Sequence, residues 1–326
     1  MKKIDFLGYR YIAYALSIIS FIATIILVFT PGIQYGVDFK GGTELLLRFS
    51  KPVDDETIRK VLKDDCKLNY IIVQSVFSNA NAETNAVKAN LTTGQSTDKL
   101  IKTDFLAEKP MIDPETKKEV KTLKEVKDKI TAALQAKDKE LTIKETLSEV
   151  SVGPSIGQEL RNQAAIAVMI ALIGILAYVT YQFEFKFALP SILALFHDVI
   201  ITIGFIILTG KEMDMIQLTV LLTVVGYSIN DTIIICDRVR ENYRIMKKMK
   251  YYDLVNESLA QVFSRTVITV LTTELPLIAM YIYGGEVLSA FASSMIFGTV
   301  IGCFSSIYVV SPMIVAWKEY EEKVVA

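Results

Sequence analysis

Six apolar stretches of helical length constrain this chain more than any other feature, because a helix needs about 20 mostly apolar residues to cross the hydrocarbon core of a bilayer. They lie near 11–30, 163–183, 188–208, 216–236, 266–283 and 288–312. The chain is 52% hydrophobic, which is high for a soluble domain. The sequence therefore predicts an α-helical membrane protein with six spans. The first span follows Lys2, Lys3 and Arg10 but lacks an A-x-A cleavage site, so we expect a retained anchor.

The short loops predict which side of the membrane each segment occupies, because Lys and Arg concentrate in cytoplasmic loops. The loop at 237–264 carries six basic residues within its first half, whereas the short loops on the other side carry only Lys211. We therefore expect the N-terminal segment 1–30 to start in the cytoplasm, and the tail at 313–326 to lie there. The long segment 31–162 is then extracytoplasmic, and the bundle of the remaining spans covers 163–312.

The segment 31–162 has the composition and periodicity of a soluble α+β domain. Strand-like alternation occurs around Leu45–Phe49 and 87–91, and Ile71–Phe77 and Leu141–Val150 are further strand candidates. Helical spacing joins Ile58, Val61 and Leu62, and it recurs from Leu123 to Leu134 behind a Thr122-x-x-Glu125 capping box. The order β-α-β-β-α-β predicts a ferredoxin-like domain, with 94–121 as a surface insertion.

Several function classes lack their usual residues. The 35 basic and 36 acidic residues nearly cancel, which disfavours a nucleic-acid partner. Three scattered cysteines and a single histidine do not provide a metal centre, so we expect no metal and no cofactor. There is no G-x-x-x-x-G-K-[ST] phosphate loop and no G-x-S-x-G elbow. We therefore do not expect an enzyme, and ATP hydrolysis has no sequence support.

Charged residues inside the spans are the strongest functional candidates, because a carboxylate at the bilayer centre is unfavourable by at least about 2.5–3.5 kcal/mol. Asp231 lies in the fourth span beside Asn230, and the alternative to a functional role is hydrogen bonding between helices. Arg265 begins the fifth span, where the alternative is an anchor whose head reaches the interface. His197 and Asp198 in the third span are either a second proton relay or a packing contact.

Glu274 is a further intramembrane carboxylate, nine residues beyond Arg265 in the fifth span. Nine residues turn a helix by about 180°, so we do not expect the two to pair within the helix. Glu274 can instead face a partner chain or a polar cavity, or Pro276 can open the helix locally to water.

Glycine-rich segments bracket the predicted domain. Gly36, Asp38, Gly41 and Gly42 follow the first span, and Gly153-Pro154 precedes the second. These segments are either tight turns or hinges between domain and membrane.

Small and basic residues suggest two further surfaces. Gly226 in the fourth span and a face of the sixth span let another helix approach closely, the latter comprising Gly298, Gly302, Ser305 and Ser306. The basic run Arg238–Lys250, followed by apolar positions at helical spacing up to Phe263, is typical of an amphipathic segment on the inner leaflet or of a solvated elbow.

Five motifs occur in order along almost the whole chain. They are Gly36-Val37-Asp38-Phe39-x-Gly41-Gly42-Thr43, Phe196-His197-Asp198-Val199, Gly226-Tyr227-Ser228-Ile229-Asn230-Asp231-Thr232, Ser264-Arg265-Thr266 and Ser305-Ser306-Ile307-Tyr308. With them the chain resembles the SecD/SecF family of protein-export membrane subunits, within the resistance-nodulation-division (RND) superfamily. The insertion at 94–121 has no place in this resemblance, and Glu274 departs from the family pattern, which usually has an apolar residue there.

The resemblance implies a six-span half-transporter that pairs with SecD beside the SecYEG channel of the bacterial cytoplasmic (inner) membrane. Its implied partners also include unfolded preproteins and accessory subunits such as YidC. The implied activity is proton-driven release of preproteins on the outer face, with protons as the coupling ion and Asp231 and Arg265 as the gating pair. A solute exporter of similar architecture and a non-transporting scaffold are the competing functions.

Overall fold

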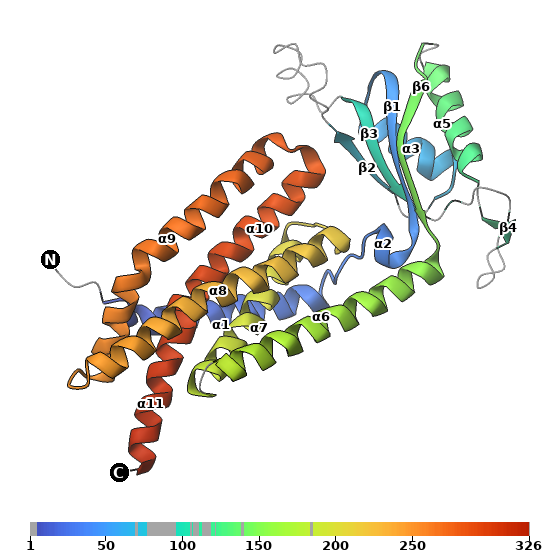
Figure 1. Cartoon of the computed structure of the whole chain (residues 1–326). Coiled ribbons are helices and arrows are strands. Elements are labelled where there is room, and N and C mark those ends of the chain that lie inside the picture. The colour runs from blue at the N-terminus through green and yellow to red at the C-terminus, as the bar shows by residue number, and fades with distance from the viewer. Residues whose placement is uncertain are drawn as a thin grey trace. The chain divides into compact units, whose positions relative to one another are not determined.

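The structure is a computed structural model that describes residues 5–68, 71–76, 96–104, 106, 111–112, 119–120, 122–137, 140–182 and 185–325. Its contacts divide the chain into two compact units (Figure 1). One comprises 1–34 with 164–326, and the other runs from Tyr35 to Gln163, against the predicted 31–162. The predicted strand at 87–91 lies outside the described residues.

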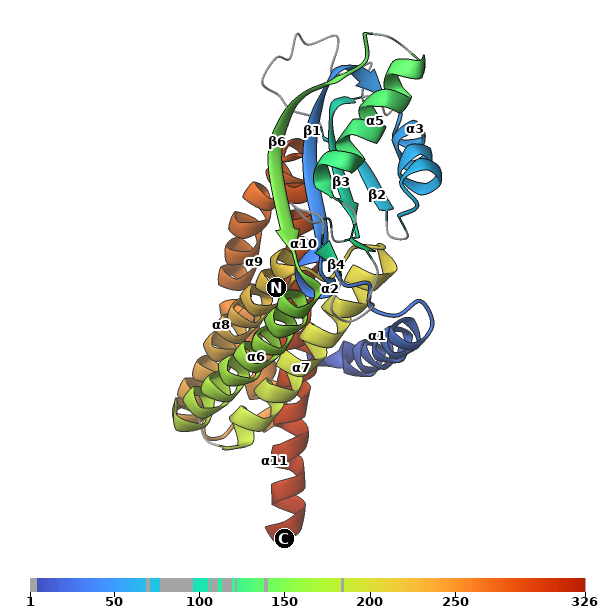
Figure 2. The same cartoon turned by 90° about the vertical axis from the view of Figure 1, so that its right-hand side faces the viewer.

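Six helices in the described chain are long and apolar enough to cross a membrane, which confirms the six predicted spans. The protein is therefore a multi-pass membrane protein. The helices are α1 (Arg10–Phe29, preceded by a 3₁₀ turn at Leu7–Tyr9), α6 (Pro154–Gln182), α7 (Phe185–Leu208), α8 (Met215–Ile245), α9 (Tyr251–Tyr283) and α10 (Gly285–Ser305). A π-helical turn at Ser306–Val310 joins α10 to α11 (Ser311–Val325), so the last span continues to the C-terminal end (Figures 1 and 2).

The starts of two helices follow from local chemistry. The Asp214 side chain accepts a hydrogen bond from the backbone N–H of Gln217 at 2.8 Å and so caps α8. Pro154 occupies the first position of α6, where a missing N–H breaks no helical hydrogen bond. Pro276 lies inside α9, yet the helix continues past it to Tyr283.

Helices α8 and α10 run in parallel and touch at every fourth residue. A Cβ on Gly298 would clash with the Val224 side chain, and one on Gly302 would lie 3.0 Å from the Ser228 Cβ. One turn further on, Thr232 and Ser306 share a hydrogen bond of 2.8 Å between their hydroxyls. The small residues of the sixth span therefore pack against α8 of this same chain.

The segment predicted as a cytoplasmic basic loop at 237–264 is a helical hairpin instead. Helix α8 continues to Ile245 and α9 begins at Tyr251, so only a five-residue turn separates them. The apolar positions Leu254, Val255 and Leu259 are at most 2% exposed and belong to the core of the membrane unit. They pack inside the bundle, so this face is not free to lie on a lipid surface.

The second unit contains a four-stranded antiparallel sheet in the order β2-β3-β1-β6. Helices α3 and α5 lie on one face of it (Figure 2). Its elements are α2 (Val37–Lys40), β1 (Gly42–Val53), α3 (Asp55–Lys60) with a π-helical turn at Val61–Asp65, β2 (Ile71–Val76), β3 (Ser96–Thr103), the small pair β4 (Met111–Ile112) and β5 (Glu119–Val120), α5 (Leu123–Lys137) and β6 (Ile143–Val152).

The predicted surface insertion at 94–121 is wrong for its first part. Residues Ser96–Thr103 form β3, which pairs with β1 on one side and β2 on the other. Ile101 is fully buried against the helices. The charge of Asp98 on the same strand is paired, because its carboxylate accepts two hydrogen bonds of 2.8 Å from the Arg48 guanidinium. This contact raises the pKa of the Arg48 guanidinium.

Candidate functional site

The centre of α8 holds a buried carboxylate. Asp231 is 6% exposed, and its neighbour Thr232 bonds to α10. Among the described residues, the Asp231 carboxylate makes no hydrogen bond and no ion pair with any side chain. It is therefore not held in place as a simple packing contact between helices. Asn230, the adjacent predicted residue, is exposed and lines the groove between α8 and α9 that Arg265 also borders.

The antiparallel contacts of α8 with α9 fix the depth of Arg265 relative to Asp231. Tyr227 bonds to Thr273 at 3.0 Å, and Arg238 donates to Gln261 at 2.6 Å, so numbers on α9 rise as those on α8 fall. Arg265 then lies level with about residue 235. At about 1.5 Å per residue it is about 6 Å from Asp231 along the helix axis. The two do not form a direct ion pair in this conformation.

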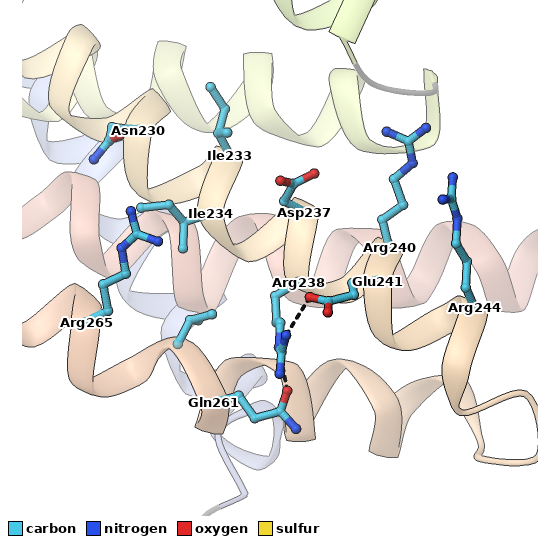
Figure 3. A pocket seen from close by; sticks show the side chains of 11 residues that line it. Asn230, Ile233, Ile234, Asp237, Arg238, Arg240, Glu241, Arg244, Gln261 and Arg265 are labelled. Carbon is cyan, nitrogen blue, oxygen red and sulfur yellow. Dashed lines mark hydrogen bonds and ion pairs between the residues drawn. The ribbon is translucent and has the colours of Figure 1, made fainter.

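Arg265 borders a groove between α8 and α9 with a cavity volume of about 850 Å³ (Figure 3). Four arginines and two acidic residues contribute to its wall. The lining comprises Asn230, Ile233, Ile234, Asp237, Arg238, Arg240, Glu241, Arg244, Gln261, Val262 and Arg265. Arg238 is engaged with Glu241 and Gln261, as the dashed lines in Figure 3 show. The Arg265 guanidinium makes no such contact within the described chain, so it is free to respond to the charge state of Asp231.

Asp198 on α7 forms hydrogen bonds to two other helices, α8 and α10. It is fully buried, and its Oδ2 accepts hydrogen bonds from Ser228 of α8 at 2.5 Å and from Ser305 of α10 at 2.7 Å. Its Oδ1 lies 2.8 Å from the Nδ1 of His197, whose Nε2 is buried without a partner among the described residues. This geometry accounts for a packing role. A relay role stays a prediction.

Glu274 forms no hydrogen bond with Asp231 in the described chain. It is 6% exposed on α9, and its Oε1 accepts a hydrogen bond from the Thr299 hydroxyl of α10. It lies on the other side of Asp231 from Arg265 along the bundle, which agrees with the predicted absence of a pair between Arg265 and Glu274. The sequence did not single out Thr299, although a threonine inside an apolar span is a usable signal for a carboxylate partner.

The two glycine-rich segments meet each other. A Cβ on Gly41 would lie 2.6 Å from the Cα of Pro154, and one on Gly157 would lie 2.7 Å from the backbone N of Gly41. Gly36 precedes α2, which contains Asp38, and Gly42 is the first residue of β1. The segments predicted as turns or hinges thus form one close backbone crossing. Gly157 belongs to the same predicted segment, Gly153-Pro154-Ser155-Ile156-Gly157, and lies in the first turns of α6. Gly226, predicted as a packing position, is exposed and has no atom within 4 Å of an added Cβ.

Comparisons with known proteins give a consistent result. The family model of the protein export membrane protein SecD/SecF, C-terminal, matches residues 129–320, and the SecD/SecF GG motif matches residues 26–53. Protein translocase subunit SecF of Calditerrivibrio nitroreducens is 33% identical over 99% of this chain and 96% of its own length. Protein translocase subunit SecDF of Thermus thermophilus is 37% identical over 97% of this chain.

A solved structure is similar as well. The crystal structure of SecDF from Thermus thermophilus superposes with a TM-score of 0.77 at 34% identity and covers 97% of this chain. This chain spans 39% of the length of that protein. The GG motif includes Gly41 and Gly42, whose backbone crossing is described above.

Proposed function

Because this chain belongs to the SecD/SecF family of protein export membrane proteins, we propose that it is a protein-translocase subunit that uses the proton-motive force to help release preproteins. The relatives named translocase subunits support the export role. The observation that carries the proton coupling is the buried Asp231 carboxylate, which lacks any bonding partner among the described side chains, while residue Arg265 of α9 lies about 6 Å from it along the helix axis.

The proposed partners follow from the family. The Thermus thermophilus relative is named SecDF, and this chain matches 39% of its length. We therefore propose a SecD-like half as the partner within the membrane, beside the SecYEG channel and together with accessory subunits such as YidC. The exposed Arg265 groove supports this assignment, because an arginine at membrane depth is favourable only when protein or water faces it.

The proposed orientation places both termini in the cytoplasm of a bacterium and the α+β unit outside its cytoplasmic (inner) membrane. The arginines at the α8–α9 hairpin support it, since basic residues near span ends favour the cytoplasmic side. The element order β1-α3-β2-β3-α5-β6, with sheet order β2-β3-β1-β6, supports a ferredoxin-like fold for the external unit.

The proposed cycle is a change in the charge of Asp231. When Asp231 takes up a proton, its attraction for Arg265 is lost, and the contacts among α8, α9 and α10 relax. When it releases the proton, the attraction returns. One proton moving down about 150 mV releases about 3.5 kcal/mol. That free energy shifts a two-state equilibrium by a factor of a few hundred, which is enough to drive the external unit between two positions.

The experiment compares Asp231→Asn with Asp253→Asn, a matched control that removes an exposed carboxylate of α9 outside the groove lining. Each variant replaces the native protein in cells at equal abundance, and release of a pulse-labelled secreted protein is followed with and without the proton-motive force. We expect slow release only for Asp231→Asn, with no further slowing when the force is removed. Equal, force-dependent release in both variants would eliminate the coupling role and favour a scaffold.

A further inference from the structure

We propose that Glu274 and Thr299 form a second proton-binding site in the membrane, which passes its proton to Asp231. This inference rests on the proposed function, because it assigns the route by which a proton reaches the same carboxylate. Glu274 belongs to α9 and Thr299 to α10, so the site lies between two helices that pack against α8.

The hydrogen bonds around Glu274 are better satisfied when this carboxyl group carries a proton. The Thr299 hydroxyl has a single hydrogen, yet it lies within bonding distance of the Glu274 Oε1, of the Met295 carbonyl at 2.9 Å and of the Ile296 carbonyl at 3.1 Å. An ionised Glu274 needs that hydrogen for itself. A protonated Glu274 donates to the Thr299 oxygen instead and leaves the threonine hydrogen for its backbone carbonyl.

Burial points in the same direction. Glu274 is 6% exposed, and its Oε2 is buried without a hydrogen-bond partner among the described residues. An ionised carboxylate with one oxygen unbonded in an apolar surrounding is strongly unfavourable, whereas the neutral acid leaves only a carbonyl-like oxygen unbonded. No cation forms an ion pair with Glu274 within the described chain, so nothing there neutralises the charge except a proton.

The position of the site is set by the contacts between α8 and α9. The hydrogen bond of 3.0 Å between Tyr227 and Thr273 places Glu274 level with about residue 226 of α8. This is about 7.5 Å along the axis from Asp231, toward the Met215 end of the helix. Arg265 lies on the opposite side of Asp231. In the proposed orientation the order from outside to inside is therefore Glu274, Asp231 and Arg265.

The groups packed around Glu274 leave few alternative proton carriers. From α8 the nearest titratable side chains are the Tyr227 hydroxyl, which is bonded to Thr273, and Asp231 itself. From α10 the facing polar group is the Thr299 hydroxyl, and the Cys303 thiol one turn further along α10 interacts with Asp231. Lys211 lies nearer the Met215 end of α8 and donates to Ser293 at 2.6 Å.

An apolar cluster closes the bundle toward the Met215 end. It contains Val220, Val224, Leu277, Ala292 and Met295, all of which are buried. A proton must therefore enter when these side chains part, and the site then holds it after they close.

The proposed step moves one proton and balances charge. The O–H bond on the Glu274 carboxyl breaks, leaving a carboxylate, and a new O–H bond forms on the Asp231 carboxylate, which becomes neutral. Water that reaches the bundle between the two groups carries the proton over the separation. Glu274 is then reloaded from the outer side, while Asp231 releases its proton toward Arg265 and the cytoplasm.

The test uses the full chain purified in lipid together with its SecD-like partner and measures pH-difference infrared spectra in the carboxylic-acid C=O region. We expect a band that Glu274→Gln loses and Asp231→Asn keeps. Thr299→Val should shift this band, because the hydrogen bond is lost, while Thr299→Ser, which keeps the hydroxyl, should restore it. A spectrum that is unchanged in Glu274→Gln would overturn the proposal. The threonine variants provide the same test should Glu274→Gln fail to fold.

Export in cells separates this inference from the proposed function. We expect Glu274→Gln to slow force-dependent release about as much as Asp231→Asn does. If Asp231→Asn slows release and Glu274→Gln does not, the second site is refuted and the role of Asp231 stands. If neither variant changes release, the proposed function falls and the second site falls with it.

Discussion

Gly41 should tolerate no side chain, whereas Gly153 in the neighbouring segment should. Gly41 has φ +80° and ψ 145°, a backbone conformation that only glycine adopts readily. Replacement by alanine is unfavourable there by about 1–3 kcal/mol. The new Cβ would also lie 2.6 Å from the Cα of Pro154, a backbone atom that cannot rotate away. Overpacking of this kind adds about 1–3 kcal/mol. Gly41→Ala should therefore lower the free energy of unfolding by about 2–6 kcal/mol.

Gly153→Ala is the matched control, because no atom lies within 4 Å of its added Cβ and its φ is not positive. The assay is the rate at which a maleimide labels Cys66, located by peptide mass spectrometry. Cys66 is 1% exposed in the core of the α+β unit, so it reacts only when that unit opens. Since about 1.4 kcal/mol corresponds to a factor of ten, Gly41→Ala should label at least about 30 times faster than the parent. Equal rates for the two glycine variants would refute the reasoning.

Three further predictions concern the membrane unit and are read from thermal unfolding in detergent. Asp198→Ala should lower stability by about 1–3 kcal/mol, because two hydrogen bonds between helices are lost, while Asp198→Asn keeps an acceptor and should lower it less. Gly298→Val should lower stability by about 1–3 kcal/mol through its clash with Val224, whereas Gly174→Ala, whose Cβ meets open space, should be neutral or stabilising. Burial lowers the pKa of Lys211, so the unfolded chain holds that proton more tightly and stability should rise with pH up to the ordinary pKa of 10.5. Lys211→Met should remove this rise, and an unchanged alkaline profile would contradict the assignment.

The spans could be predicted because their signal is local, whereas the hairpin between α8 and α9 could not. The charged residues beyond the fourth span look like a solvated loop in a hydropathy window. They are helical because Arg238 bonds to Gln261 and Asn242 bonds to Ser258 across the two helices. Pairs of this kind join residues 16 to 23 positions apart, a separation that periodicity within one segment does not detect.

The same reason explains the missed strand β3. Its sequence carries Asp98 and Lys99 at its centre, which is typical of a surface segment. In the structure Asp98 is bound by Arg48 of β1, and Lys99 is fully buried against Asp55 of α3 and Ser75 of β2. Each charge is compensated by a neighbour from another element, so the strand is central despite its polarity.

The candidate site was predicted as individual residues, and their grouping required the fold. Asp231, Asp198 and Glu274 stand out because carboxylates are rare in apolar spans. Which hydroxyl groups they contact depends on the packing of α8 against α10, where glycines and serines let the helices approach. Only the packed bundle therefore shows that Asp198 accepts hydrogen bonds from two other helices, whereas Asp231 accepts none from the described side chains.

The pairing of β1 with β6 has a consequence for biosynthesis. Thr43 and Ser151 lie opposite each other and share a hydrogen bond, yet they are 108 residues apart in the chain. A ribosome adding about 5–20 residues per second needs about 5–20 s to make the second strand after the first. Throughout that interval at least one edge of β1 is unpaired, and both edges are unpaired until β3 has been made. The nascent α+β unit therefore needs shelter from aggregation until the start of the second span has been synthesised.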